Sequence, residues 1–301
     1  ELHRAQFSAV AAVGQLKSDQ IEQWRRERSV DAAVAARDPA FAIALPALSN
    51  PALPALRARA RARLKSVAVA SDYTDGLLTS MDGRVLLAAH DSTPPLDSAT
   101  RAAIMQAAQT SGGVLSDLFL GRDDSVFIDA VSVVRDGMGR PLGAIALRAN
   151  ARTYLYPLID AWPNPSRSAE TVLIERRGND VLSLSDLRYE ANSALRWRRS
   201  LTLVEFPAVQ AVLGRRGPVE GVDYRGVDVL ADLRAIPGSP WVMVAKVDAD
   251  ELLAEARYRA WVISLMVASL ILAAAAVTAY GYRRRQAGVF RGLFESTREA
   301  Q

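Results

Sequence analysis

The chain has 301 residues and a formal net charge of +4, and 50% of its residues are hydrophobic, so it is long enough for more than one domain. It contains no cysteine and only two histidines, which excludes disulfides, a thiol nucleophile and histidine-rich metal sites. The basic residues are nearly all arginines scattered among alanines, a pattern that does not indicate a nucleic-acid surface. P-loop, GxSxG, HExxH and dinucleotide-binding motifs are also absent. We therefore expect no catalytic site, cofactor, metal or nucleic-acid partner.

The first predicted element is one long amphipathic helix, from residue 2 to about residue 37. Its apolar side chains recur mostly every three to five positions, and they are Phe7, Val10, Val13, Leu16, Ile21 and Trp24. Pro39 ends the helix, because proline removes a helical hydrogen bond and clashes with the preceding turn. A stripe this long must cover either its own domain or a partner helix, and we expect two copies to associate through this helix and the helix that leads to the membrane.

Strands and helices then alternate up to a proline-rich boundary. The expected elements are a helix at 52–65, strands at 76–80 and 84–89 around the turn Met81-Asp82-Gly83, a helix at 96–109, strands at 114–120, 126–135 and 142–149, and a helix at 152–161. Two prolines in the segment WPNPS (162–166) mark the boundary.

Past this boundary the same order of elements returns. The expected elements are strands at 171–175 and 181–184, a short helix at 207–213, and strands at 221–223, 227–236 and 241–247. The segment AIALRANARTYL (144–155) superposes on VMVAKVDADELL (242–253) at a constant offset of 98 residues. We therefore predict two copies of one unit, each an antiparallel sheet with helices packed on it, which is an α+β architecture.

The C-terminal part contains one segment suited to cross a bilayer. Residues 260–282 carry no charged side chain, and roughly 20 apolar residues suffice to span the hydrocarbon core. Three arginines at 283–285 follow at once and should stay on the cytoplasmic side. We therefore expect residues 1 to about 259 to lie outside the cytoplasm. The polar opening of the chain resembles neither a signal peptide nor a membrane helix, so we expect an upstream membrane helix to be missing.

Arg148 is the first candidate binding residue. In its strand, Ala144, Ala146 and Arg148 share one face, while Ile145 and Leu147 share the other. The isoleucine and leucine form the expected core face, and the small alanines should leave a space with a guanidinium at its end. A planar guanidinium suits a carboxylate or phosphate, so we expect Arg148 to contact a small anionic solute. The alternative is that it reaches water or pairs with an acidic residue, either Asp129 or Asp136.

Four other residues are weaker candidates for the same pocket. Asp117, Arg122 and Asp129 lie on or between neighbouring strands, and each could equally be a solvated strand or loop residue. Tyr73 precedes the first strand and could close a pocket with its ring and hydroxyl. In the second unit, Lys246 is the counterpart of Arg148, but bulkier valines share its face. That face should be filled, which favours a structural second unit.

Taken together, these elements resemble the double Cache sensor domain of bacterial transmembrane receptors. The segment LRAIPGSPWVMVAKVDADELLAEA resembles the proline-glycine turn, tryptophan and final strand that close the membrane-proximal Cache module. The segment GRPLGAIALRAN resembles the end of the distal module. The resemblance covers residues 1 to about 282, and it implies that ligands bind mainly in the distal module, at about 62–157.

The resemblance implies a long N-terminal helix, two tandem PAS-like Cache modules with antiparallel sheets, and a C-terminal transmembrane helix. The expected boundaries are 1–61 for the long helix and connector, 62–162 for the distal module, 163–252 for the proximal module, 253–282 for the juxtamembrane and transmembrane helix, and 283–301 for the start of a cytoplasmic output domain. Amino-acid-binding members carry an arginine-x-tryptophan motif and an aspartate in the last distal strand. Residues 62–157 lack the motif, and Arg148 stands at the aspartate position.

We therefore predict a ligand-sensing region on the periplasmic side of a bacterial inner membrane. It would bind a small solute and signal through the transmembrane helix, as in sensor histidine kinases of two-component systems or diguanylate cyclases. The final segment, VFRGLFESTREAQ, resembles the start of a PAS domain, so a kinase or cyclase domain would follow. One alternative is a membrane-anchored solute-binding or scaffold module without signalling output. Another is an ectodomain enzyme, which the missing catalytic motifs argue against.

Overall fold

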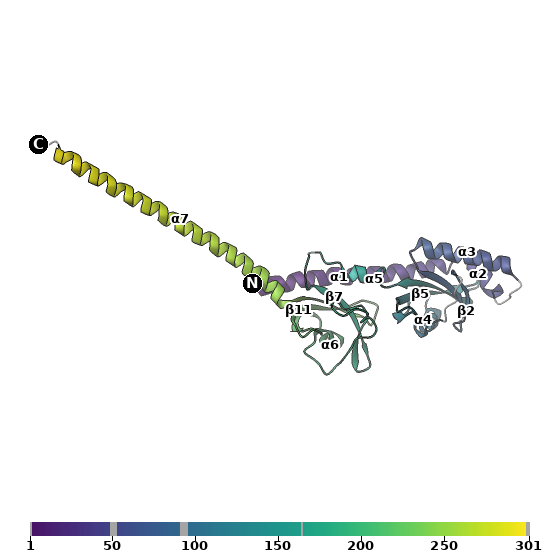
Figure 1. Ribbon diagram of the computed structural model, residues 1–301. Helices are drawn as coiled ribbons and strands as arrows, with labels where there is room; N and C mark the ends of the chain where they lie inside the picture. The colour runs from purple at the N-terminus through teal and green to yellow at the C-terminus, as the bar shows by residue number, and fades with distance from the viewer. Residues whose placement is uncertain (1, 49–52, 91–95, 164, 299–301) are drawn as a thin grey trace. The chain divides into compact units, whose positions relative to one another are not determined.

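A computed structural model of the protein describes residues 2–48, 53–90, 96–163 and 165–298. The chain divides into two compact units, Glu1–Asp248 and Ala249–Gln301. The first unit holds two sheets with helices beside them, and the second consists of the helix α7 (Ala249–Arg298) (Figure 1). The expected order of a long helix, two antiparallel sheets and a C-terminal apolar helix is confirmed.

The first sheet contains six strands, paired antiparallel. Its strands are β1 (Asp75–Thr79), β2 (Val85–Ala88), β3 (Val114–Leu115), β4 (Phe119–Leu120), β5 (Val126–Arg135) and β6 (Pro141–Asn150). The order across the sheet is β2-β1-β6-β5-β3, and β4 also pairs with β5. The single strand expected at 114–120 is thus divided into β3 and β4.

The two faces of β6 are buried against different helices. These helices are α1 (Leu2–Ala35), α2 (Pro39–Ala47) and α3 (Pro54–Ala70) on one face and α4 (Ser98–Ala108) on the other. Ile145 and Leu147 lie in the cluster formed with α1, α2 and α3, so the expected core face is confirmed. Ala144 and Ala146 lie in a second apolar cluster with Ile104 of α4, and both alanines are 0% exposed. The expected open space over these alanines is therefore wrong, because α4 fills it.

The second sheet repeats the arrangement of the first. Its strands are β7 (Glu170–Arg177), β8 (Asp180–Ser183), β9 (Arg198–Ser200), β10 (Gly217–Val222), β11 (Asp228–Ala235) and β12 (Val242–Asp248), and helix α6 (Pro207–Val212) packs on it. Helix α5 (Leu155–Asp160) follows β6 and contacts α1 and β7. The order is β10-β11-β12-β7-β8-β9. Its central run β8-β7-β12-β11 corresponds to β2-β1-β6-β5 of the first sheet, so the repeat recognised in the sequence is a repeat of topology.

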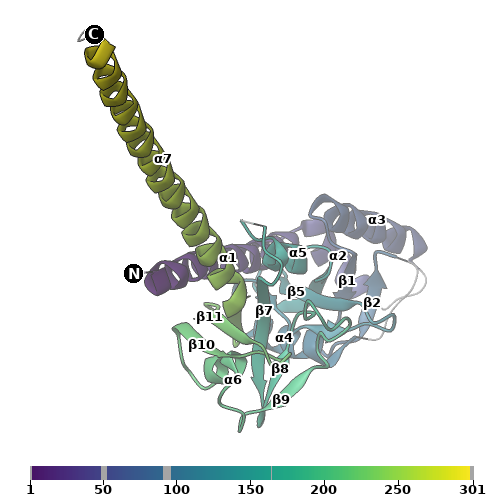
Figure 2. The ribbon, with the colours of Figure 1, turned by 60° about the vertical axis from the view of Figure 1, so that its left-hand side comes forward.

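Helix α1 packs along both sheets. It contacts β5 of the first sheet and β11 and β12 of the second, and both ribbon views show it beside the two modules (Figures 1 and 2). Val10 and Ile21 on this helix are 3% and 0% exposed. The apolar stripe is therefore long because it covers two modules of its own chain. The association of two copies along α1 stays a prediction.

Pro39 begins a helix that the sequence analysis did not expect. Helix α1 ends at Ala35, as expected before this proline, but α2 starts at Pro39 itself. Proline suits a first helical position, because its fixed φ is helical and its missing N–H has no partner to lose there. Asp38 caps the same end, since its Oδ1 accepts a hydrogen bond from Ala40 N at 2.9 Å.

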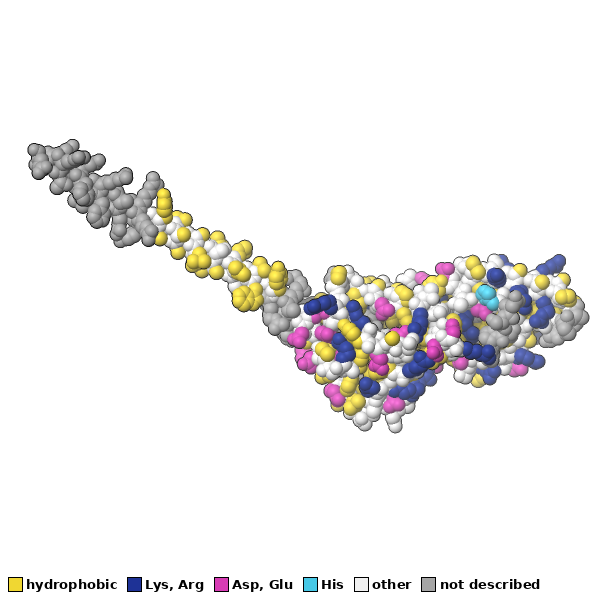
Figure 3. All heavy atoms as spheres, in the orientation of Figure 1, with side chains coloured by type: hydrophobic (Ala, Val, Ile, Leu, Met, Phe, Trp, Pro, Cys, Tyr) yellow, Lys and Arg dark blue, Asp and Glu magenta, His cyan; other side chains and the backbone are white. Residues whose placement is uncertain are grey.

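The C-terminal unit consists of helix α7 and includes a long apolar segment. Within α7 the segment Ala260–Tyr280 has 21 residues and a mean hydropathy of 2.4, and none of its most apolar window is buried. Hydrophobic side chains cover this part of the helix in the space-filling view (Figure 3). By length and composition the helix can cross a membrane.

Candidate ligand-binding sites

Two neighbouring strands in the first sheet join Asp129 and Arg148 in a bidentate ion pair. Asp129 on β5 and Arg148 on β6 are register partners. Arg148 Nε donates to Asp129 Oδ1 at 2.9 Å, and Arg148 Nη2 donates to Asp129 Oδ2 at 2.8 Å. Asp129 is 0% exposed and Arg148 is 8% exposed, so the pair lies almost wholly out of water. The expected alternative, an ion pair of Arg148 with Asp129, is therefore present in the structure. Contact of Arg148 with a solute stays a prediction.

A helix and two aromatic rings complete the surroundings of this pair. Thr100 of α4 donates its hydroxyl to Asp129 Oδ2 at 2.6 Å, so the helix that covers the sheet also orients the carboxylate. The rings of Phe119 and Phe127 have their centroids 5.0 and 5.5 Å from Arg148 Cζ, within the range of a cation–π contact. The guanidinium is thus fixed by one carboxylate and two rings.

Further acidic groups lie near Arg148. Asp75 on β1 is its register partner on the other side, and Asp97 is the N-cap of α4. Burial alone would lower the pKa of Arg148, but the hydrogen-bonded Asp129 carboxylate, with the fields of Asp75 and Asp97, raises this pKa above the ordinary arginine value. The Asp75 carboxylate also lies 3.2 Å from His90 Nδ1. The fields of three carboxylates, Asp129, Asp75 and Asp97, therefore act on the Arg148 guanidinium and offset its positive charge.

In the described contacts the side chains of the other three predicted residues do not join this pair. Asp117 is half-exposed and forms an ion pair with Arg177 of the second sheet at 3.0 Å. Arg122 lies in an exposed turn after β4. Tyr73 is 6% exposed, and its hydroxyl donates to Asp31 of α1 at 3.0 Å, so the ring packs toward α1.

The sequence reasoning missed the residues that hold the pair in place. One signal was available for Thr100: Asp97 before an apolar run is an N-cap signature, and position 100 then lies in the first turn of the helix. No comparable signal identified Phe119 and Phe127, because their contact with Arg148 depends on the register of β4 and β5.

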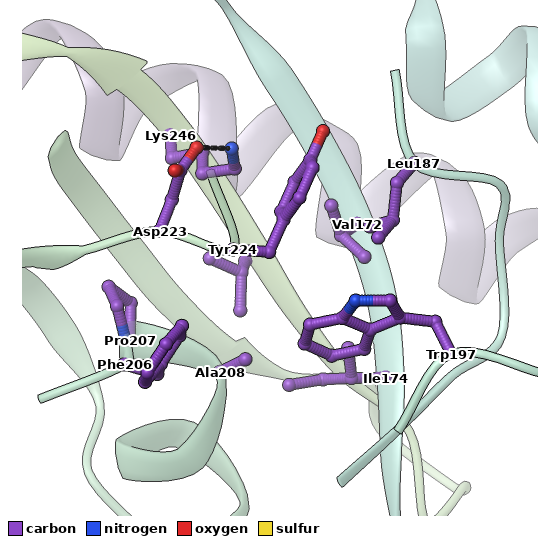
Figure 4. Close-up of a pocket in the computed structure, with 11 residues that line it drawn as sticks. Val172, Ile174, Leu187, Trp197, Phe206, Pro207, Ala208, Asp223, Tyr224 and Lys246 are labelled. Carbon is purple, nitrogen blue, oxygen red and sulfur yellow. Dashed lines mark hydrogen bonds and ion pairs between the residues drawn. The ribbon is translucent and has the colours of Figure 1, made fainter. Parts of the chain in front are cut away.

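The second module has a cavity beside Lys246, the counterpart of Arg148. Figure 4 shows it beside α6, with Trp197, Phe206 and Tyr224 around it and Lys246 at one end. Its volume is about 30 Å³, enough for about two water molecules. Val244 also lines it, so the expectation that the valines fill this face is wrong.

Lys246 is held by a network of its own. Its Nζ lies 2.7 Å from Glu170 Oε2 and 2.6 Å from Asp223 Oδ2, and 4.6 Å from the centroid of the Tyr224 ring. Tyr224 in turn donates its hydroxyl to Glu170 Oε2 at 3.1 Å. Lys246 is 3% exposed, so its ammonium is buried between two carboxylates and one aromatic ring.

No protein-family model matches this sequence, and no curated protein sequence matches it. Solved structures share its fold. The ligand-binding domain of the Pseudomonas fluorescens chemoreceptor CtaA, solved with L-isoleucine, aligns with a TM-score of 0.57 at 15% identity, over 84% of this chain and 97% of that one. The ligand-binding domain of the Pseudomonas aeruginosa amino acid chemoreceptor PctB, solved with L-Arg, aligns with a TM-score of 0.56 at 15% identity, over 82% and 89%.

A kinase sensor domain is similar to the same extent. The sensor domain of the Vibrio cholerae histidine kinase DctB aligns with a TM-score of 0.53 at 15% identity, over 81% of this chain and 98% of that domain. The chain therefore has the double Cache fold of ligand-binding sensor domains, as the resemblance in its sequence implied.

Proposed function

We propose that the first unit is the extracytoplasmic sensor of a transmembrane signalling receptor, which binds a small solute in its distal module. The observation that carries this proposal is the junction between the sensor fold and the apolar helix. Strand β12 ends at Asp248, and α7 begins at the next residue, Ala249. A helix joined to a central strand without a linker can pass a displacement of the sheet to the membrane segment. This arrangement favours a sensor over an anchor that only tethers a binding module.

The orientation and partners follow from the same proposal. The three arginines at 283–285 support a cytoplasmic position for the C-terminal end of α7, with the two modules in the periplasm. The module boundaries stay at 62–162 and 163–252, with the long helix and connector at 1–61. The first unit acts by binding and not by catalysis. Two copies associate along the outward side of α1, where Leu16 and Val34 are 45% and 63% exposed. Membrane anchoring raises the effective concentration, so weak contacts suffice.

The Arg148–Asp129 pair is the polar anchor of the proposed solute site. The two hydrogen bonds to Asp129 use Nε and Nη2 of Arg148, which leaves the Nη1 amino group for a carboxylate or carbonyl of the solute. Because Asp75 and Asp97 act on the same guanidinium, a solute that also carries a positive group gains from their field. Charge balance at this pair thus favours a zwitterion or an amine over the simple anion expected from the sequence.

Testing this site needs a variant that removes the pair without leaving a lone buried charge. The double substitution Arg148→Met with Asp129→Leu replaces both partners by apolar groups of similar size. The exposed Arg140, which pairs with Asp136 in the β5–β6 turn at 2.7 Å, supplies the matched control Arg140→Met.

The experiment is a thermal-shift screen of the full chain in detergent against L-amino acids, primary amines and organic acids at constant ionic strength. A bound solute raises the melting temperature by mass action. We expect stabilisation by amino acids or amines in the wild type and in Arg140→Met, and its loss in the double variant. A solute that stabilises the double variant as strongly as the wild type would place the site elsewhere.

A further inference from the structure

A polar cavity of about 270 Å³ lies where α1 meets an edge of each module. Arg25 and Ser29 of α1 line it, together with Asp117 beyond β3 and Trp241 at the start of β12. The walls come close together here: a Cβ added at Gly113 would lie only 1.9 Å from Ser29 O. The cavity is therefore bounded by backbone that is packed tightly, and it is separate from the Arg148–Asp129 pair.

The Arg25 guanidinium lies over the Trp241 ring at one side of this cavity. Its Cζ lies 4.3 Å from the centroid of the Trp241 ring, and Trp241 is 2% exposed. Its Nη2 donates to Gly238 O at 3.2 Å. Stacking uses the face of the guanidinium and leaves its N–H groups in the plane, where a carboxylate can bind to two of them. In the described contacts only Nη2 of Arg25 donates a hydrogen bond. Nε and Nη1 are not among the buried side-chain atoms that lack a partner, so both are accessible.

Within the part of the chain that the structure describes, Arg25 has no carboxylate partner of the kind that Arg148 and Lys246 have. Arg148 and Lys246 each lie within 3 Å of one, at 2.8 and 2.6 Å. Among the described residues no ion pair joins Arg25 to an acidic side chain, and the nearest acid in its field, Asp117, is paired with Arg177. Burial lowers the pKa of Arg25 to about 10, and Asp117 opposes this effect only in part. The cavity thus contains a partly desolvated cation that has no counter-ion of its own.

We propose that this cavity binds a small carboxylate, with Arg25 as its charge partner. A guanidinium can bind a carboxylate through two parallel N–H···O hydrogen bonds. Ser29 lies one helical turn after Arg25 on the same side of α1 and can donate a second hydrogen bond. The volume is below the roughly 300–1,000 Å³ of drug-sized pockets, so a short acid fits. A bound acid would join α1 to both modules, and this site does not depend on which solute the distal module takes.

The test is isothermal titration of sodium acetate and sodium succinate into the full chain in detergent, with ionic strength held constant by sodium chloride. Arg25→Ala removes the charge partner, and Arg25→Lys keeps the charge but loses the stacked fork. The matched control is Arg26→Ala, since Arg26 is on the same helix, exposed, and paired only with Glu22 in the described contacts. We expect Arg25→Ala to weaken binding about ten- to a hundredfold, Arg25→Lys to weaken it by a smaller factor, and the control to bind as the wild type does.

Circular dichroism of each variant shows whether it is folded, and Arg25→Lys carries the test if Arg25→Ala is not. Absence of binding by both acids to the wild type overturns the proposal, and so does an unchanged affinity in Arg25→Lys and Arg25→Ala. Binding that is lost in the Arg148→Met, Asp129→Leu double variant but kept in Arg25→Ala assigns the acid to the distal site and overturns it as well. Equal affinity for inorganic phosphate contradicts the choice of a carboxylate.

Discussion

The distal and proximal modules place a basic side chain at the same point of their last strand, and they surround it in different ways. Arg148 has one bidentate partner, whereas Lys246 has two separate carboxylates. In the distal module the 11-residue helix α4 covers small alanines without leaving a space. In the proximal module the 6-residue helix α6 leaves a cavity beside larger valines. The face with the larger strand residues is thus the one that has a cavity, so the size of the strand residues alone does not decide which face is filled.

The largest effect should come from breaking the distal pair on one side. Arg148→Ala leaves the Asp129 carboxylate buried at 0% exposure with Thr100 as its remaining side-chain partner in the described contacts. We expect the free energy of unfolding to fall by about 3–5 kcal/mol. The Arg148→Met, Asp129→Leu double variant should lose far less, because no charge stays buried. Urea denaturation of the full chain in detergent measures both, and equal losses would show that the ion pair is not the cause.

Removing Lys246, the corresponding basic side chain of the proximal module, should lower the free energy of unfolding by less. After Lys246→Ala, Asp223 keeps its ion pair with Arg225 at 2.7 Å, and Glu170 keeps the hydroxyl of Tyr224. We expect a loss of about 1–3 kcal/mol, below that of Arg148→Ala. Since the truncation removes three methylenes and the ammonium, n-propylamine should raise the melting temperature of Lys246→Ala and leave that of the wild type unchanged. If propylamine acts equally on both, its effect does not come from the space that Lys246 leaves.

Small-to-large substitutions test the packing difference directly. Ala146→Val adds volume where α4 already fills the space, so we expect a loss of about 1–3 kcal/mol from overpacking. Val244→Ile adds one methylene beside the cavity of about 30 Å³ and should change stability by less than about 1 kcal/mol. Denaturation curves of the two variants give the comparison. A larger loss for Val244→Ile than for Ala146→Val would reverse the description of the two faces.

The smallest effect concerns pH and the proximal network. Burial alone would raise the pKa of Asp223, but its contacts with Lys246 and Arg225 more than offset burial, and the pKa lies below the ordinary value of 3.8. A lowered carboxyl pKa stabilises the fold above the unfolded-state value, and this stability is lost as the pH falls below about 4. Asp223→Asn should therefore lose stability at neutral pH and show a flatter decline in acid. Melting curves of both proteins between pH 2.5 and pH 7 measure the difference, and parallel declines would contradict it.

Much of the fold could be predicted because it depends on local patterns. The strand expected at 126–135 has those same bounds as β5, since a run of β-branched and apolar residues is bounded by turns on both sides. The polar triplet of β9 (Arg198–Ser200) has no apolar alternation, and it becomes a strand only by pairing with β8. Helix α2 was missed because Pro39 was interpreted only as the end of the preceding helix.

The site was predicted less well, because its properties depend on contacts between distant elements. The sequence showed that Arg148 lies on one face of a strand and that Asp129 was a possible partner. It did not show that the register of β5 and β6 puts the two opposite each other. Whether α4 or α6 covers a face, and whether Arg25 of α1 stacks on Trp241 more than 200 positions away in the chain, depends on the packing of the whole unit.

A structure of the protein with a solute taken from the thermal-shift screen would show whether the distal module senses a small solute. We expect the solute in the distal module, within hydrogen-bond distance of Arg148 Nη1. A solute bound only in the second module, or a distal module in which no screened solute binds, would contradict it.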